Sequence, residues 1–172
     1  MSGGFSIGKN LNRGFPGTFA AMPDNIVRSR VVNATSPEIP FGLAVSVKAD
    51  GTYALFGTGD TATNFAGVAI RTAMQATDYK DQGHAAYAPQ QNADVMLRGE
   101  ISVECRVGTP TVNGKVYVRI TENASVPAGV VGGFEAQADG ANTIEITNCR
   151  WAIGEKDVNN VSALVIMTRN VA

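Results

Sequence analysis

The feature that most constrains the fold is a two-residue alternation of apolar and polar side chains, which recurs in short runs along the chain. It is clearest over residues 101–107, where four apolar residues alternate with three polar ones. Successive side chains of a strand point to opposite faces of a sheet, so this run predicts a strand with one buried face. Residues 43–47 and 116–120 repeat the pattern. No stretch carries a convincing helical stripe, and only residues 72–80 have the character of one or two helical turns.

Short runs of β-branched and other apolar residues predict six further strands, at residues 27–32, 66–71, 95–97, 143–147, 150–153 and 163–168. Asp50-Gly51 predicts a hairpin between residues 43–47 and 53–55, and Asn113-Gly114 predicts a second hairpin just before residues 116–120. Many short strands at close spacing indicate an all-β chain. Its 172 residues are enough for a single antiparallel β-barrel or β-sandwich-like domain.

The first 25 residues follow neither period and combine five glycines and two prolines with isolated large apolar residues. Such a segment is costly to order alone and too apolar for a simple linker, so we expect it to order against another surface. The expected organisation is an extended Gly/Pro-rich arm over residues 1–25 and an all-β domain over residues 26–172. An arm that wraps its own domain is the alternative. The residues expected to bind a partner are Phe5, Ile7, Leu11, Arg13, Phe15 and Phe19.

Charge and hydropathy bear on the choice of partner. The 14 Lys and Arg residues are spread along the chain and nearly balance the 15 Asp and Glu residues, which disfavours nucleic acid. No apolar run approaches membrane-spanning length and the N-terminus lacks the apolar core of a secretion signal, so we expect no membrane partner and synthesis in a cytoplasm. Charged residues make up only 17% of the chain, so we expect protein partners to cover part of its surface.

Residue types for catalysis or metal binding are scarce. His84 is the only histidine, and its polar, glycine-containing surroundings predict an exposed loop. A multi-histidine metal site is therefore impossible, and a nucleophile, base and carboxylate triad has one candidate base. Cys105 and Cys149 lie far apart in predicted strands, where a buried thiol acts as a small hydrophobic side chain. We expect no catalytic residues, no metal and no cofactor.

The order and spacing of several segments give a family resemblance. These segments are Phe15-Pro16-Gly17, residues 38–45 and 65–71, Tyr87-Ala88-Pro89, and residues 95–103, 114–119, 148–151 and 163–166. They cover most of the chain, and in this order they resemble the structural cement proteins of tailed bacteriophages, also called capsid decoration proteins. The insert at residues 109–113, before Gly114, departs from the shorter turn of that family.

The resemblance implies an all-β protein that assembles as a homotrimer and sits on the outside of an icosahedral shell, at or near three-fold positions. Its partner is then the major capsid protein of the same phage, and its role is to clamp neighbouring capsomers. The protein is thus expected in the virion, on the outer capsid surface. Three subunits supply three copies of each weak contact, which strengthens attachment through effective concentration.

Two other classes of function stay open at this point. A carbohydrate-binding β module on a virion surface or fibre presents aromatic side chains in a shallow groove, and the candidates are Tyr53, Phe56, Phe65, Tyr79, Tyr87 and Trp151. An enzyme on a β scaffold needs a metal or an acid–base cluster, which one histidine and scattered carboxylates do not supply.

Overall fold

The computed structural model describes residues 13–72 and 86–167, and within them the chain contains strands, two short 3₁₀ helices and no α-helix. All pairs of named strands are antiparallel. The strands form three sheets, none of which closes into a barrel within the described residues. The predicted all-β antiparallel class is therefore confirmed. Residues 73–80 of the one stretch with helical character, and His84, lie outside the described residues.

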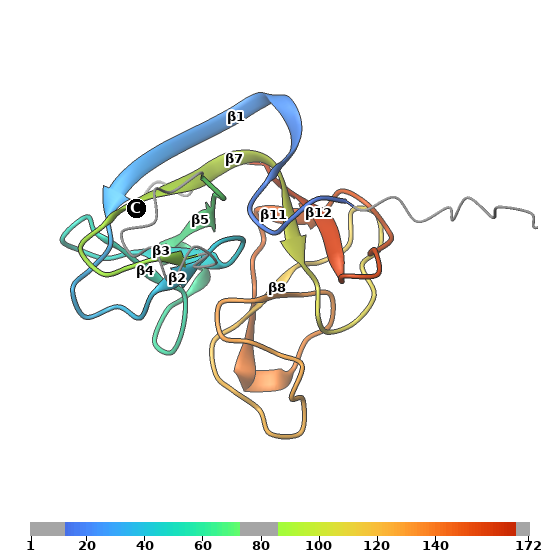
Figure 1. Ribbon diagram of the computed structural model, residues 1–172. Helices are drawn as coiled ribbons and strands as arrows, with labels where there is room; N and C mark the ends of the chain where they lie inside the picture. Colours follow the sequence, from blue (N-terminus) through green and yellow to red (C-terminus); the bar gives the residue numbers. More distant parts are fainter. Residues whose placement is uncertain (1–12, 73–85, 168–172) are drawn as a thin grey trace, which may run out of the picture.

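The longest strands, β1 (Phe19–Val31) and β7 (Asn92–Glu104), pair over most of their length and cross the molecule side by side (Figure 1). The other edge of β7 is shared by two strands. Its first half pairs with β5 (Phe65–Ala69) and its second half with β12 (Val161–Ile166). β7 therefore ties together the two halves of the molecule.

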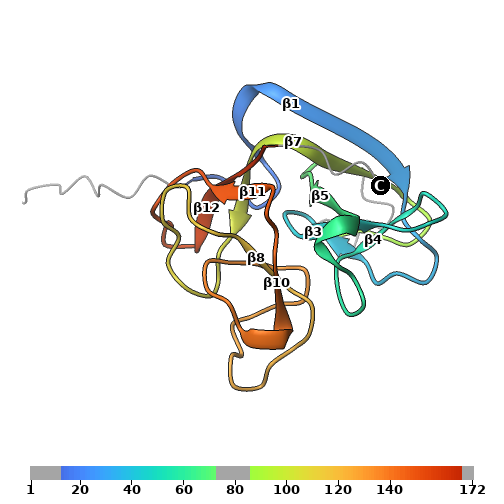
Figure 2. The same ribbon diagram turned by 180° about the vertical axis from the view of Figure 1, so that it is seen from behind.

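The large sheet continues beyond these strands. Next to β5 come β3 (Ala44–Val47) and β4 (Tyr53–Leu55), and next to β12 comes β11 (Cys149–Trp151). A three-stranded sheet places β8 (Tyr117–Arg119) between β9 (Phe134–Glu135) and β10 (Thr143–Glu145), and β2 (Ile39–Pro40) pairs with β6 (Ala86–Tyr87). The 3₁₀ helices η1 (Ala62–Asn64) and η2 (Gly140–Asn142) lead into β5 and β10. Figures 1 and 2 show a first lobe, β2 to β5, and a second lobe, β8 to β12, which β1 and β7 span.

The side chains of β7 enter two different hydrophobic cores. The larger core holds Met96 and Ile101 of β7 and is filled mainly by residues of the second lobe, among them Val118, Phe134, Trp151 and Leu164. The smaller core holds Val95 and Leu97 of β7 and is filled by residues of the first lobe, among them Ile39, Val45, Tyr53 and Tyr87. The first half of β7 is thus buried on both faces, whereas its second half alternates buried Ile101 and Val103 with the partly exposed Glu100 and Glu104.

The alternation of β7 shifts by one residue at Gly99. Met96 and Ile101 enter the same core although they are five residues apart, which a regular strand does not allow. Gly99 has a φ of 129°, and a Cβ at this position would collide with the side chain of Asn25 in β1. The β1–β7 register also shifts on either side of Ile26, opposite this point. The sequence therefore reads as two strands, 95–97 and 101–107, where the structure has one bulged strand.

Of the two predicted hairpins, the first is confirmed and the second is wrong. β3 and β4 pair across the turn that contains Gly51, whose φ is 81°. Asn113-Gly114 also forms a turn, with a φ of 60° at Asn113, but β8 after it pairs with β9 and β10 and not with the strand before it. Both edges of that preceding strand, β7, are already occupied, one by β1 and the other by β5 and β12. A turn motif in the sequence shows where the chain reverses, but it does not determine which strands pair with each other.

A buried ion cluster holds the three-stranded sheet of the second lobe together. The side chains of Arg119 and Glu135 are 0% and 1% exposed, and they form two hydrogen bonds, Nε to Oε1 at 2.5 Å and Nη2 to Oε2 at 3.0 Å. Arg119 Nη1 also donates to Asp139 Oδ2 at 2.8 Å. The hydrogen bonds to Glu135 raise the pKa of the Arg119 guanidinium. The pair joins β8 to β9 by side chains as well as by backbone.

Glu135→Gln removes one of the two carboxylates that face the buried Arg119 guanidinium, and Asp139 keeps the other, so we expect the free energy of unfolding to fall by about 1–3 kcal/mol. Equilibrium urea unfolding measures the change. The control replaces Arg119 by Met and Glu135 by Leu in one variant, which takes both charges out of the core and is expected to recover most of the loss. A Glu135→Gln variant as stable as the wild type would contradict this account of the cluster.

Candidate functional site

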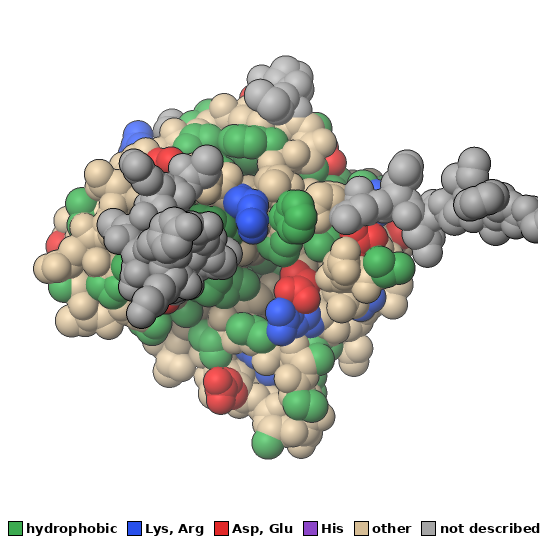
Figure 3. Space-filling model, viewed as in Figure 1, with side chains coloured by type: hydrophobic (Ala, Val, Ile, Leu, Met, Phe, Trp, Pro, Cys, Tyr) green, Lys and Arg blue, Asp and Glu red, His purple; other side chains and the backbone are tan. Residues whose placement is uncertain are grey.

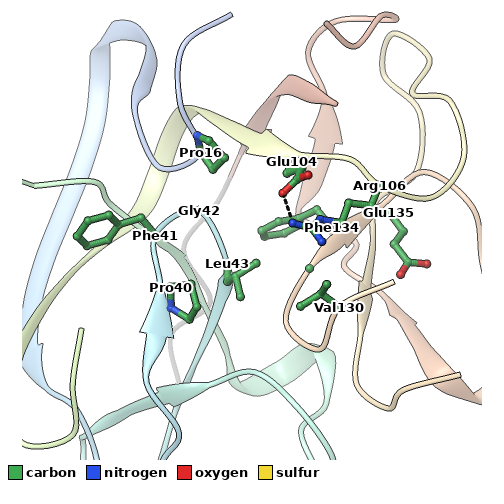
Figure 4. Close-up of a pocket in the computed structure, with 11 residues that line it drawn as sticks. Pro16, Pro40, Phe41, Gly42, Leu43, Glu104, Arg106, Val130, Phe134 and Glu135 are labelled. Carbon is green, nitrogen blue, oxygen red and sulfur yellow. Dashed lines mark hydrogen bonds and ion pairs between the residues drawn. The ribbon is translucent and has the colours of Figure 1, made fainter. Parts of the chain in front are cut away.

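A groove lies between the two lobes, where the face shown in Figure 3 is hollowed near its centre. Its volume is about 190 Å³. Figure 4 shows first-lobe residues along one side of the groove and second-lobe residues along the other. The lining is mainly apolar and includes three charged residues: Glu104 and Arg106, which form an ion pair at 2.8 Å, and the buried Glu135. We call this the interlobe groove, defined by Pro16, Pro40, Phe41, Leu43, Glu104, Arg106, Val130 and Phe134.

Residues 13–18, which we call the arm root, contribute Pro16 to the groove. The Gly17 N–H donates to the Ser102 carbonyl of β7 at 2.8 Å, and the Gly17 carbonyl accepts from the Arg71 N–H at 2.8 Å. Gly17 and Gly42 have positive φ values of 86° and 80°, and a Cβ on Gly42 would lie 2.5 Å from the Cβ of Pro16. Only glycine at position 42 lets the arm root pack this closely against the first lobe.

Phe15 is 60% exposed, yet contacts hold its ring in place. The Arg71 guanidinium carbon lies 5.0 Å from the centre of the Phe15 ring and 5.8 Å from the centre of the Phe41 ring. Phe41 in turn packs edge-on against Tyr87, with ring centres 5.1 Å apart. Cation–π stacking orients an exposed ring without burying it. Phe15 therefore presents ordered apolar surface next to the groove.

Arg13 begins the arm root, and three side chains hold it. The Arg13 N–H donates to Asp157 Oδ2 at 3.0 Å, and the Arg13 carbonyl accepts from Ser102 Oγ at 3.1 Å. The Arg13 guanidinium donates to Glu155 Oε2 at 3.3 Å, an ion pair on the surface that contributes little by itself. The backbone of Arg13 is thus fixed on both sides of its Cα.

The Asp157 carboxylate accepts three backbone N–H groups. Besides Arg13, it accepts from Asn159 at 2.8 Å and from Val161 at 2.9 Å, both through Oδ1. Burial alone would raise the pKa of Asp157, but the N–H donors of Arg13, Val161 and Asn159 outweigh it and lower the pKa. Asp157 is therefore charged at neutral pH and connects the arm root to the loop before β12.

The structure describes three of the six residues that we predicted to bind a partner. Arg13 and Phe15 lie in the arm root, and Phe19 begins β1 with 41% of its surface exposed. The other three lie outside the described residues, and their part in binding stays a prediction: Phe5, Ile7 and Leu11.

The predicted boundary between arm and domain, at residues 25 and 26, falls inside β1. The part of β1 before this boundary lies against β7 of the same chain, with Phe19 opposite Ile101 and Ala21 opposite Glu100. Residues 1–12 of the predicted arm lie outside the described residues. The division of the chain into an arm and a domain therefore stays a prediction.

Sequence reasoning missed the interlobe groove. Its two walls come from segments far apart in the chain, around Leu43 and around Phe134, and no periodicity relates them. One usable signal was Phe41-Gly42-Leu43, where a glycine stands between two large apolar residues ahead of an alternating strand. Glycine in such a place indicates close approach of another backbone, here that of the arm root.

The groove offers apolar contact and one ion pair, which suit binding to another protein. Across residues 13–72 and 86–167, no three His, Cys, Asp or Glu side chains are placed to hold a metal ion. Cys105 and Cys149 are buried free thiols, as predicted, and burial raises the pKa of both. Over the same residues, no helix has the length and apolar character needed to cross a membrane.

Comparison with known proteins decides the family. Residues 4–170 match the family described as "Structural cement protein (E217 gp24/Pam3 gp6)". The chain belongs to this phage cement protein family. The resemblance seen in the sequence is therefore confirmed, and so is the expectation of a structural protein without a catalytic role. The cement protein is a component of the phage capsid.

A solved structure shares the fold of this cement protein. A chain of "The capsid of Myoviridae Phage XM1" superposes with a TM-score of 0.69 at 17% sequence identity, and the match covers 99% of this chain and 100% of that chain. At this identity the likeness concerns the fold. No curated protein sequence matched the cement protein.

Acidification should release Arg13 from Asp157. Because the pKa of Asp157 in the folded state lies below its ordinary value of 3.8, its stabilising contribution is present above that value. The contribution is lost as the pH falls through the folded-state pKa. We therefore expect the Arg13 amide resonance in ¹H–¹⁵N NMR spectra to titrate with a midpoint below pH 3.8 and to stay unchanged between about pH 5 and 8. A midpoint above pH 3.8 would contradict the assignment.

Proposed function

We propose that the cement protein binds the outer surface of the icosahedral shell through its arm, Phe15 and the interlobe groove, with the major capsid protein of the same phage as its partner. The observation that carries the proposal is Phe15, an ordered aromatic ring that is 60% exposed beside an apolar groove. Burial of an exposed aromatic side chain in an interface lowers the free energy of binding. Such side chains contribute much of the affinity of protein interfaces. Contact with two neighbouring capsomers at once would stabilise the junction between them.

The exposed side of β1 supports the proposed homotrimer. Within the described residues, the only named strand that pairs with β1 is β7. The large apolar side chains of β1 that are between 37% and 45% exposed are Phe19, Ile26, Val27 and Val31. A long edge strand with apolar side chains is normally covered by a partner, because it otherwise promotes aggregation. A sister subunit on this surface would bury it, and three linked subunits would hold the shell more tightly than one.

The carbohydrate-binding alternative loses its basis among the described residues. Five of the six aromatic side chains that suggested it are at most 2% exposed: Tyr53, Phe56, Phe65, Tyr87 and Trp151. Tyr79 lies outside the described residues. Buried rings have no face to stack on a sugar.

The proposal is tested by two measurements on the purified chain. Light scattering is expected to give three times the chain mass of 18.0 kDa, and the protein is expected to pellet with expanded shells of its own phage. A monomer that stays in the supernatant would contradict both parts of the proposal. Binding to a glycan array without binding to shells would favour the alternative.

Phe15→Ala is expected to weaken shell binding by about 30-fold, which corresponds to about 2 kcal/mol for an aromatic side chain at the centre of an interface. The free energy of unfolding should change by no more than about 0.5 kcal/mol, because most of the ring is already exposed. The matched control is Val112→Ala, since Val112 is 65% exposed and does not line the groove. Equal losses of shell affinity in the two variants would contradict the role of Phe15.

Deleting residues 1–12 tests the rest of the arm without changing any described residue. We expect the shortened chain to fold with wild-type stability and to bind shells more weakly, because the arm is proposed to add contacts outside the domain core. Co-sedimentation measures the binding, and thermal unfolding checks the fold. A control of full length replaces Phe5, Ile7 and Leu11 by Ser and should lose the same affinity. Shell binding equal to that of the wild type in both variants would contradict the proposed contribution of the arm.

A further inference from the structure

The loop between β11 and β12 is built to hold the arm root, and three consecutive residues take part. The Glu155 side chain bonds to the Arg13 guanidinium, and its carbonyl accepts from Ser162 Oγ in β12 at 2.8 Å. Lys156 Nζ donates to the carbonyls of Cys105 and Gly108 at 3.1 and 3.2 Å, which anchors the loop to the end of β7. The loop is therefore fixed to the large sheet at two points.

Asp157 follows these two residues and reaches the arm root through its side chain alone. Its own backbone closes the loop, because the Asp157 N–H donates to Val161 and the Asp157 carbonyl accepts from Asn160, both at 3.0 Å. The two carboxylate oxygens have different donors. Oδ1 accepts the N–H groups of Asn159 and Val161 in the loop, and Oδ2 accepts the N–H of Arg13. A hydrogen bond to a charged acceptor is stronger than one between neutral groups.

We propose that Asp157 is a positioning residue that fixes the point and direction in which the N-terminal arm leaves the domain. Any chain before Arg13 must start from an N–H group that points at Asp157 and is held from the other side by Ser102. A fixed starting point reduces the conformations that the arm loses when it binds, so it increases affinity without adding a contact. The inference rests on the proposed function in one respect, which is that the arm contacts the shell.

Asp157→Asn tests the bond to Arg13 separately from the bonds within the loop. The amide oxygen still accepts the N–H groups of Asn159 and Val161, whereas the amide NH₂ then faces the N–H of Arg13, donor against donor. We expect trypsin to cleave after Arg13 on the order of ten times faster, since one hydrogen bond to a charged group no longer opposes local opening. Cleavage after Lys9 in the same chain gives the reference rate. Binding to shells should weaken in parallel, and thermal unfolding should be nearly unchanged.

Two further variants provide a second test of the arm root and a matched control. Ser102→Ala removes the bond to the Arg13 carbonyl without touching the 155–161 loop, and it should also speed cleavage after Arg13. Asp50→Asn is the matched control, because Asp50 accepts the N–H of Thr52 within its own turn at 2.9 Å and has no bond to the arm root. This control should leave both cleavage and shell binding unchanged.

Unchanged cleavage after Arg13 in Asp157→Asn would overturn the inference, whether or not the wild type binds shells. Faster cleavage with wild-type affinity for shells would overturn it as well, since the position of the arm would then have no effect on binding. Failure of the wild-type chain to bind shells would contradict the proposed function instead. The cleavage rates would in that case still decide whether Asp157 fixes the arm.

Discussion

The structure depends on β7, which is hydrogen bonded along both edges and contributes side chains to both hydrophobic cores. β1 covers one edge, β5 and β12 share the other, and each face packs into a different core. A strand with this many hydrogen bonds and core contacts tolerates few substitutions. The irregularity at Gly99 lets Met96 and Ile101 enter the same core. The two lobes also pack directly against each other in the larger core, where the Phe65 and Phe134 rings meet, and Phe134 also lines the groove.

The surface that we propose for binding is a consequence of the same arrangement. The arm root is hydrogen bonded to Ser102 in the second half of β7. This places Pro16 in the lining of the groove and Phe15 beside it. Close contact at Gly42 holds the backbone at Pro16 and Gly17, and the Arg71 guanidinium lies over the exposed Phe15 ring. In the proposed attachment to the shell, an aromatic side chain that already lies beside the groove would need little ordering on binding.

Local patterns in the sequence predicted the class of fold well and the assembly of the fold less well. Alternation at residues 43–47 and 101–107 is a property of single strands, and those strands are present. Pairing depends on competition between distant strands, so the turn at Asn113-Gly114 did not reveal that β8 pairs with β9 and β10. The groove could not be predicted for the same reason, because its walls come from segments that lie far apart in the sequence and are brought together by the fold. The structure places Arg13 and Phe15 in the arm root, and their part in binding stays a prediction.

The central claim is that the face bearing Phe15 and the interlobe groove meets the shell. The most direct measurement is a cryo-electron microscopy reconstruction of expanded shells decorated with the purified protein, at a resolution that places side chains. The account predicts that Phe15 and the groove are buried against the major capsid protein, and that Arg13 keeps its bond to Asp157. A reconstruction in which this face points away from the shell, with Phe15 in solvent, would contradict the account.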